Sequence, residues 1–139
     1  MNNIKMASGY LKEAEIRLET AENSFKREFY SYVVRQAQET VELSLKSILR
    51  LVGIEPPKWH DVGIALRKER ERFPEWFQSE IDELAFISRE LRGERERSMY
   101  GDEEMGLPPS EIYTKYDGEQ ALKWAKKVFE ACKKLVEQY

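Results

Sequence analysis

Apolar residues recur at intervals of three and four positions along most of the chain, which is the spacing of one face of an α-helix. The first such stripe runs through residues 4–25, and its alternating alanines allow a neighbouring helix to approach closely. A second stripe covers residues 30–52 and is broader, so that only a narrow side of this helix is polar. We expect a bend near Phe25–Tyr30 and a central position in a bundle for the second helix.

Helix-stopping residues separate this region from the next one. Gly53 can adopt the left-handed conformation that ends a helix, and Pro56 with Pro57 prevents its continuation. A short third helix is expected to open at His60-Asp61, where the Asp61 carboxylate can cap exposed backbone N–H groups. Phe73-Pro74 should end it.

The remaining apolar stripes predict a fourth helix from about Ser79 to Leu91 and a fifth helix through residues 121–135. Strand-like alternation is lacking, so we predict an all-α fold: an up-and-down bundle of four long helices and one short helix, forming one domain over residues 1–139. The segment 98–114 shows no convincing element. Because it is long for a helix–helix connection, it is the first place to look for function.

Composition narrows the class of protein. Apolar residues make up 41% of the chain and charged residues 35%, with 26 acidic against 23 basic side chains and a net charge of −3. This balance excludes a generally basic nucleic-acid coat protein, although a local basic patch is compatible with it. The single cysteine, Cys132, falls on an apolar stripe, which argues against disulfides and a cysteine zinc site. Without an apolar signal core or a membrane-spanning run, we expect a cytoplasmic protein with no membrane association.

Four arginines lie within nine residues, at Arg89, Arg92, Arg95 and Arg97, and Tyr100 follows them. We call the four the arginine cluster. On a continuous helix, the first three would lie near one face with a modest drift and could hold phosphate oxygens, because guanidinium presents paired donors. Since glutamates alternate with the arginines, a solvated surface of Arg–Glu pairs is the simpler explanation from composition alone. Gly93 within the cluster indicates a special local geometry.

Other candidate groups are weaker. His60 is the only histidine and thus the only ordinary base near neutral pH, but its place at a helix start fits a structural turn better. Trp59, Trp76 and Trp124 could stack on bases or serve as core anchors, and Trp76 with Phe77 could face a partner subunit. Neither a metal-binding motif nor a glycine-rich phosphate loop is present, so we expect no metal and no cofactor.

Two segments of the chain resemble HEPN-domain proteins. The stretch from Tyr30 to Leu66 has the Ala37-Gln38 step followed by Glu, a Gly–Ile–Pro turn and His60-Asp61 at the next helix. The sequence SRELRGERERSMYGDEE resembles the end of the fourth helix in small archaeal and bacterial members. The resemblance covers essentially the whole chain.

The resemblance implies a helical homodimer, often paired with a minimal nucleotidyltransferase in a module of toxin–antitoxin type. The resemblance also implies a possible activity, since active members are metal-independent ribonucleases. Their motif is an Arg, four to six further residues and a His, and in some members a Tyr lies two positions after that His. Arginine would neutralise the scissile phosphate while histidine exchanges a proton. In some members a nucleotidyltransferase modifies this tyrosine with AMP, which points to Tyr100 here.

This sequence has no histidine at the motif position. Six residues on from Arg92 lies Ser98, with Tyr100 at the position of the extra tyrosine; in the other register, Tyr100 itself replaces the histidine after Arg95. Serine and tyrosine hydroxyls have pKa values too high for an efficient base at neutral pH. Arg92, Arg95 and Tyr100 are nevertheless the catalytic candidates if activity is retained.

Three hypotheses therefore stand. The first is a HEPN protein with a degenerate motif that binds nucleotide or RNA through the arginine cluster and Tyr100, together with a nucleotidyltransferase. The second is an active endoribonuclease toxin that uses Tyr100 or His60 as an unusual base. The third is a purely structural helical dimer, in which the arginines pair with carboxylates.

Overall fold

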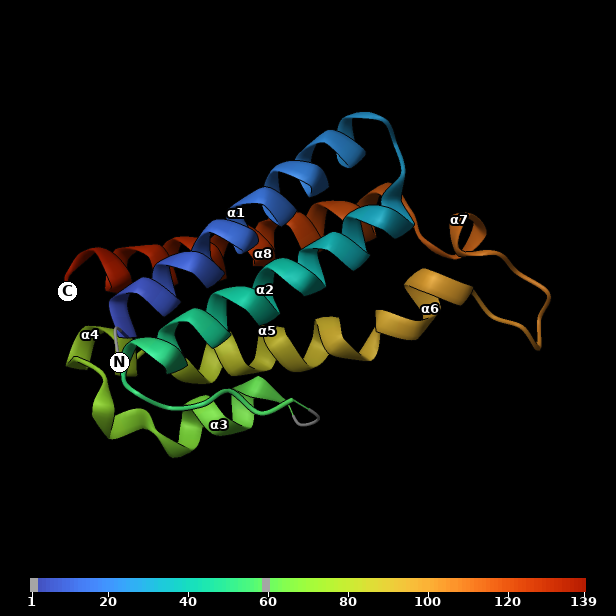
Figure 1. The fold of residues 1–139 in the computed structure, drawn as a ribbon. Helices are drawn as coiled ribbons and strands as arrows, with labels where there is room; N and C mark the ends of the chain where they lie inside the picture. Colours follow the sequence, from blue (N-terminus) through green and yellow to red (C-terminus); the bar gives the residue numbers. More distant parts are fainter. Residues whose placement is uncertain (1–2, 59–60) are drawn as a thin grey trace.

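The computed structural model describes residues 3–58 and 61–139, in which helices α1 (Asn3–Lys26), α2 (Tyr30–Leu51), α5 (Ile81–Gly93) and α8 (Lys115–Glu137) form the body of the molecule. These four long helices run alternately up and down along the bundle (Figure 1). Short elements surround this body: α3 (Val62–Lys68) packs alongside α5, α4 (Glu75–Gln78) lies at one end of the bundle, and α6 (Arg95–Tyr100) and α7 (Pro109–Ile112) lie at the other end. The predicted all-α, up-and-down bundle is confirmed.

Helix α2 is the central helix, as its broad apolar face predicts. It contacts α1, α8, α5 and α6, and Leu45, Ile48 and Leu49 are completely buried. Burying one such side chain contributes about 1.5–3 kcal/mol relative to its exposure to water. One hydrophobic cluster joins these residues to apolar side chains of α1, α5 and α8, among them Leu135 and the buried Cys132.

The chain reverses between α1 and α2, which is sharper than the bend that the sequence suggests. Helix α1 ends at Lys26, and Glu28 adopts a left-handed conformation with φ of 63°. Phe25 and Tyr30 meet edge to face across this turn, with ring centroids 5.7 Å apart. Gly118, in the first turns of α8, lies beneath them: a Cβ at this position would come within 2.9 Å of the Tyr30 ring. A residue without a side chain thus lets α8 begin against the α1–α2 turn.

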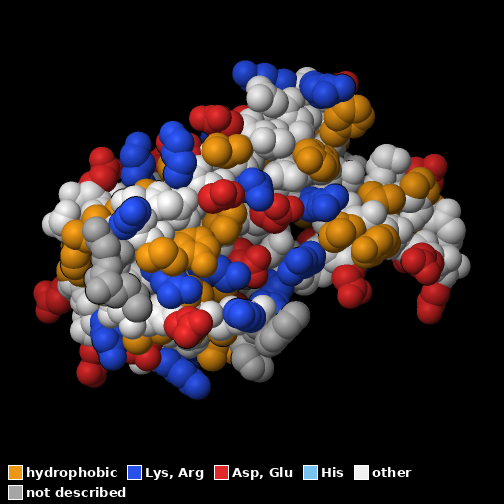
Figure 2. Space-filling view, viewed as in Figure 1, with side chains coloured by type: hydrophobic (Ala, Val, Ile, Leu, Met, Phe, Trp, Pro, Cys, Tyr) orange, Lys and Arg blue, Asp and Glu red, His pale blue; other side chains and the backbone are white. Residues whose placement is uncertain are grey.

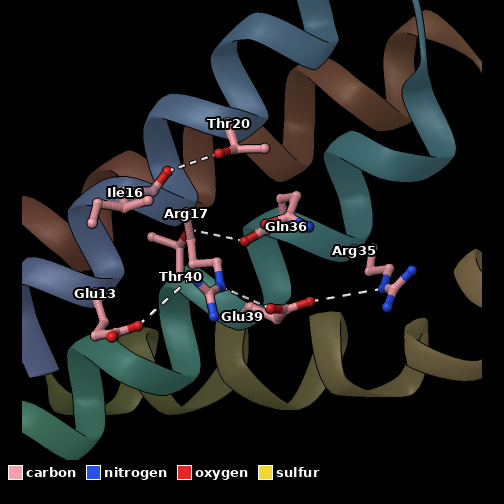
Figure 3. A network of polar contacts seen from close by, with 8 residues as sticks. All are labelled: Glu13, Ile16, Arg17, Thr20, Arg35, Gln36, Glu39 and Thr40. Atoms are coloured by element: carbon pink, nitrogen blue, oxygen red, sulfur yellow. Dashed lines mark hydrogen bonds and ion pairs between the residues drawn. The ribbon is translucent and has the colours of Figure 1, made fainter.

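A polar network fastens the outer surfaces of α1 and α2 (Figure 3). The Nε atom of Arg17 donates to Oε1 of Glu39 at 3.0 Å, and Glu13 and Arg35 lie within 3.7 Å of these two partners. Because the side chains are partly exposed, each pair contributes less than about 1 kcal/mol. The network accordingly secures the alignment of α1 against α2, while the apolar core supplies most of the stability.

The third and fourth predicted helices differ from those observed. The third ends at Lys68, five residues before Phe73, and is followed by a single 3-10 turn, Arg70–Arg72. A separate one-turn helix, α4, then precedes α5, which starts two residues after Ser79. The prediction that Trp76 and Phe77 face a partner is wrong for Phe77, because its side chain is completely buried against Phe73 and the indole of Trp76.

The prediction that residues 98–114 lack structure is also wrong. Helix α6 continues to Tyr100, and the backbones of Asp102 and Leu107 then exchange two hydrogen bonds of 2.9 Å across a tight turn. Gly101 opens this turn with φ of 76° and ψ of −154°, a combination that is essentially restricted to glycine. The turn leads through Pro108 into α7, so the segment is short-range structure that helical periodicity does not reveal.

Replacing Gly101 with alanine should disrupt this turn, because the new Cβ would collide with the carbonyl oxygen of Leu107 in addition to straining φ. We expect faster hydrogen exchange at the amides of Asp102 and Leu107. Gly106→Ala is the matched control: φ there is 68°, but a Cβ would meet no atom within 4 Å, so only the conformational cost of about 1–2 kcal/mol applies. Equal effects of the two substitutions on exchange would contradict the steric argument.

Candidate functional site

The arginine cluster spans a break between two helices. Helix α5 ends at Gly93, Glu94 lies between the helices with φ of −93° and ψ of −2°, and α6 begins at Arg95. A Cβ on Gly93 would meet nothing within 4 Å, so this glycine marks the end of α5 and is not required by close packing. The expectation of one continuous helical row of arginines is therefore wrong, and the four side chains have different surroundings.

Arg89 and Arg92 are both engaged. The guanidinium of Arg89 lies over the Phe86 ring, 5.4 Å from its centroid, and its Nε is 4.0 Å from a carboxylate oxygen of Glu90. Arg92 is half-buried and is not a free cation. Arg95 and Arg97, in contrast, are exposed, and neither side chain forms a hydrogen bond or ion pair with a residue in the ranges 3–58 and 61–139.

The residues of the ribonuclease-like motif are only partly available. Ser98 is buried, and its hydroxyl donates to the carbonyl oxygen of Arg95 at 2.9 Å. Tyr100, at the end of α6, is 64% exposed. His60 and Trp59 lie outside the described residues. Of the two registers considered for the motif, the one that ends at Ser98 thus places a buried and already bonded hydroxyl at the histidine position.

Glu94 is held by Tyr113, a contact that links the α5–α6 junction to the start of α8. The Tyr113 hydroxyl donates to Oε1 of Glu94 at 2.8 Å, and the tyrosine is 7% exposed. Burial raises the pKa of Tyr113, and the hydrogen bond and negative charge of Glu94 raise it further. The positive charge of Arg97 opposes this increase of the pKa, which indicates that Arg97 lies near the same group.

A cavity of about 210 Å³ lies beside this contact, between α5 and α8; we call it the α5–α8 cavity. Its apolar wall comes from Val34, Leu91 and Ala121, and its aromatic wall from Tyr113, Tyr116 and Trp124. Glu90, Glu94, Asp117 and Gln120 add polar side chains. Neither the cavity nor the Tyr113–Glu94 pair is evident in the sequence, because the partners come from separate segments: α2, the end of α5 with Glu94, and residues 113–124.

Charge on the visible face is mixed. Figure 2 shows Lys and Arg side chains interleaved with Asp and Glu side chains over α2 and α5, without one continuous basic field. Within the described ranges, no group of three or more His, Cys, Asp or Glu side chains is arranged to hold a metal ion. Nor is any described helix long and apolar enough to cross a membrane.

Comparisons with known proteins agree with this architecture. The family model of the HEPN domain matches residues 7–135, and the chain therefore belongs to the HEPN domain family. The structure is similar to the crystal structure of TT1696 from Thermus thermophilus, with a TM-score of 0.75 and 23% sequence identity. This similarity covers 96% of the present chain and 98% of TT1696, and it concerns the fold. Among curated proteins, none matches significantly.

Replacing Tyr113 with phenylalanine should lower the free energy of unfolding by about 1 kcal/mol near neutral pH, because the hydrogen bond to Glu94 is lost. Folding raises the pKa of this tyrosine above its unfolded value of about 10. Its contribution is therefore complete below about pH 10 and decreases as the pH rises further, so the difference between wild type and variant should shrink there.

Urea unfolding at about pH 8 and about pH 11 measures both effects, with the exposed Tyr116→Phe as the control that should leave stability unchanged. A stability difference between wild type and Tyr113→Phe that is the same at both pH values would contradict the assignment.

Proposed function

We propose that this HEPN protein binds nucleotide or RNA as a homodimer in the cytoplasm and acts with a minimal nucleotidyltransferase partner in a module of toxin–antitoxin type. The observation that carries the proposal is that the Arg95 side chain is exposed and has no carboxylate partner among the described residues. Glu94 and Glu96 flank it in the sequence, yet neither forms an ion pair with it. A cation left without a carboxylate partner is available to an anionic ligand.

The surroundings of Arg95 support binding in preference to cleavage. General base catalysis requires a group that can accept a proton near neutral pH. Ser98 is buried and already donates its proton to a backbone carbonyl, and Tyr100 is an exposed phenol. RNA cleavage by the wild type in EDTA that is lost in Arg95→Ala would instead identify a metal-independent endoribonuclease.

Exposed apolar side chains support the homodimer. Phe77 is excluded as a contact by its burial, but several large apolar side chains of α1, of α2 and of the turn between them face solvent: Ile4, Met6, Ile16, Phe29 and Tyr32. A twofold pair would duplicate each arginine of the cluster. The purely structural hypothesis requires carboxylate partners for the arginines, and within the described chain Arg95 and Arg97 have none.

Arg95→Ala should weaken binding of single-stranded RNA several-fold at low salt. Because each phosphate contact releases counterions, the slope of log K against log salt should also become shallower, by about 0.7 for one contact and about 1.4 for a symmetric pair. Fluorescence anisotropy over a series of salt concentrations measures the slope. Lys133→Ala, which removes an exposed cation of α8 near its C-terminal end, is the control. An unchanged slope in Arg95→Ala would remove Arg95 from the interface.

Tyr100 is proposed as the residue that the nucleotidyltransferase modifies, because its phenol is exposed at the end of α6. Incubation with a minimal nucleotidyltransferase and MgATP should join the Tyr100 oxygen to the α-phosphorus of ATP with release of pyrophosphate. Intact mass should show one added AMP in the wild type and none in Tyr100→Phe. Tyr116→Phe is a stringent control, since Tyr116 is even more exposed, at 76%, and should leave the modification unchanged. Loss of the modification in Tyr116→Phe, with the modification retained in Tyr100→Phe, would overturn the assignment.

A further inference from the structure

The charge of the α5–α8 cavity has one sign. Its charged lining residues are Glu90, Glu94 and Asp117, and no described lysine or arginine lines it. Arg89 and Arg97 lie outside the lining. Because a cleft lined by charges of one sign concentrates ions of the opposite sign, the cavity favours a cationic ligand and disfavours an anionic one.

Two of these carboxylates are each held by one oxygen. Oε1 of Glu94 accepts from the Tyr113 hydroxyl at 2.8 Å. Oδ2 of Asp117 accepts from the backbone N–H and the hydroxyl of Thr114 at 2.8 and 3.0 Å. The second oxygens, Oε2 of Glu94 and Oδ1 of Asp117, have no hydrogen-bond or ion-pair partner within residues 3–58 and 61–139. Both carboxylates are thus ordered before a ligand arrives, which lowers the conformational entropy that binding costs.

Aromatic rings form a second part of the lining. The indole of Trp124 is half-buried and meets Phe86 edge to face, with ring centroids 6.1 Å apart. Tyr113 and Tyr116 add two further rings. The face of an aromatic ring attracts a cation, and an indole does so most strongly. Carboxylates and aromatic rings in one cavity therefore select for the same class of ligand.

The arrangement of the carboxylates favours an organic cation over a metal ion. Within the part of the chain that the structure describes, no three acidic, histidine or cysteine side chains are placed to hold a metal ion. The volume of about 210 Å³ is below that of pockets for drug-sized ligands, so it suits one small group. Guanidinium combines a flat face that stacks on aromatic rings with paired N–H donors that match carboxylate oxygens. An ammonium group has no flat face and is more strongly hydrated.

We propose that the α5–α8 cavity binds a guanidinium group, with Trp124 as the stacking surface and Glu94 and Asp117 as hydrogen-bond acceptors. Glu90, which is 48% exposed, adds negative charge at the edge of the site. A small molecule and an arginine side chain of another protein carry the same guanidinium group. The site is separate from Arg95, and it does not depend on the binding of nucleotide or RNA there.

Titration of the ¹⁵N-labelled protein, followed by NMR chemical shifts, tests the site with three small probes. Ethylguanidinium should bind several-fold more tightly than ethylammonium, which has the same charge but no flat face. Ethylurea, a neutral analogue of similar shape, should bind more weakly than either cation. The indole N–H of Trp124, assigned with Trp124→Phe, should be among the resonances that ethylguanidinium shifts most.

Two variants separate charge from folding. Glu94→Gln keeps an oxygen that can accept from Tyr113 but removes the negative charge, so it should weaken ethylguanidinium several-fold. Glu90→Gln should weaken it as well, and an effect on folding is not expected at this exposed position. Glu104→Gln is the matched control, because it neutralises an exposed carboxylate that does not line the cavity and should leave the affinity unchanged.

The peptide acetyl-Gly-Arg-Gly-amide distinguishes the two sources of the guanidinium group. Binding of the peptide at least as tight as that of ethylguanidinium, with the same resonances shifted, would assign the site to an arginine of a partner protein. Exclusion of the peptide while ethylguanidinium binds would assign it to a small molecule.

Three results would overturn the proposal. Equal affinity for ethylurea would show that charge plays no part, and equal affinity for ethylammonium would show a general cationic preference without a guanidinium site. An affinity for ethylguanidinium that neither Glu94→Gln nor Glu90→Gln changes would place the binding elsewhere. None of these results bears on the salt slope of Arg95→Ala, so failure of this site and failure of the RNA interface are distinguishable.

Discussion

The burial of α2 among α1, α5 and α8 is the constraint on which the rest of the structure depends. Its side chains at Leu45, Ile48 and Leu49 exclude water completely, and the neighbouring long helices need α2 to cover their own apolar faces. The short elements around the bundle contribute less burial and follow the positions of the long helices. The α5–α6 junction and the start of α8 are therefore placed by a core that contains none of the proposed ligand-binding arginines.

The long helices could be predicted from the sequence because each repeats its apolar spacing over several turns. The short elements could not, since α4, α6 and α7 have six residues or fewer and are set by tertiary contacts and by single backbone conformations such as that of Gly101. Phe77 illustrates a further limit. A cluster of aromatic residues after a proline is equally compatible with an interface and with a core, and only the packing against Phe73 decides between them.

Of the candidate site, the arginine cluster and Tyr100 could be selected from the sequence, but the arrangement of these residues could not. The arginines and Tyr100 stand out in the sequence, yet the end of α5 at Gly93 separates them, so that Arg95 is unpaired among the described residues while Arg89 lies on Phe86. The pair of Tyr113 and Glu94 could not be predicted because the two residues are nineteen positions apart and belong to different elements. Periodicity reports which face of one helix is apolar, and it carries no information about partners between helices.

The glycine at position 118 has a consequence for how the α5–α8 cavity keeps its shape. Because Gly118 lies directly beneath the rings of Tyr30 and Phe25, the turn between α1 and α2 positions the first turn of α8. Neither Phe25 nor Tyr30 lines the cavity itself. Tyr116 and Asp117, which do line it, are the two residues before Gly118, so their positions depend on this packing. Substitution of Phe25 or Tyr30 would thus change the shape of the cavity from a distance, without altering any side chain that lines it.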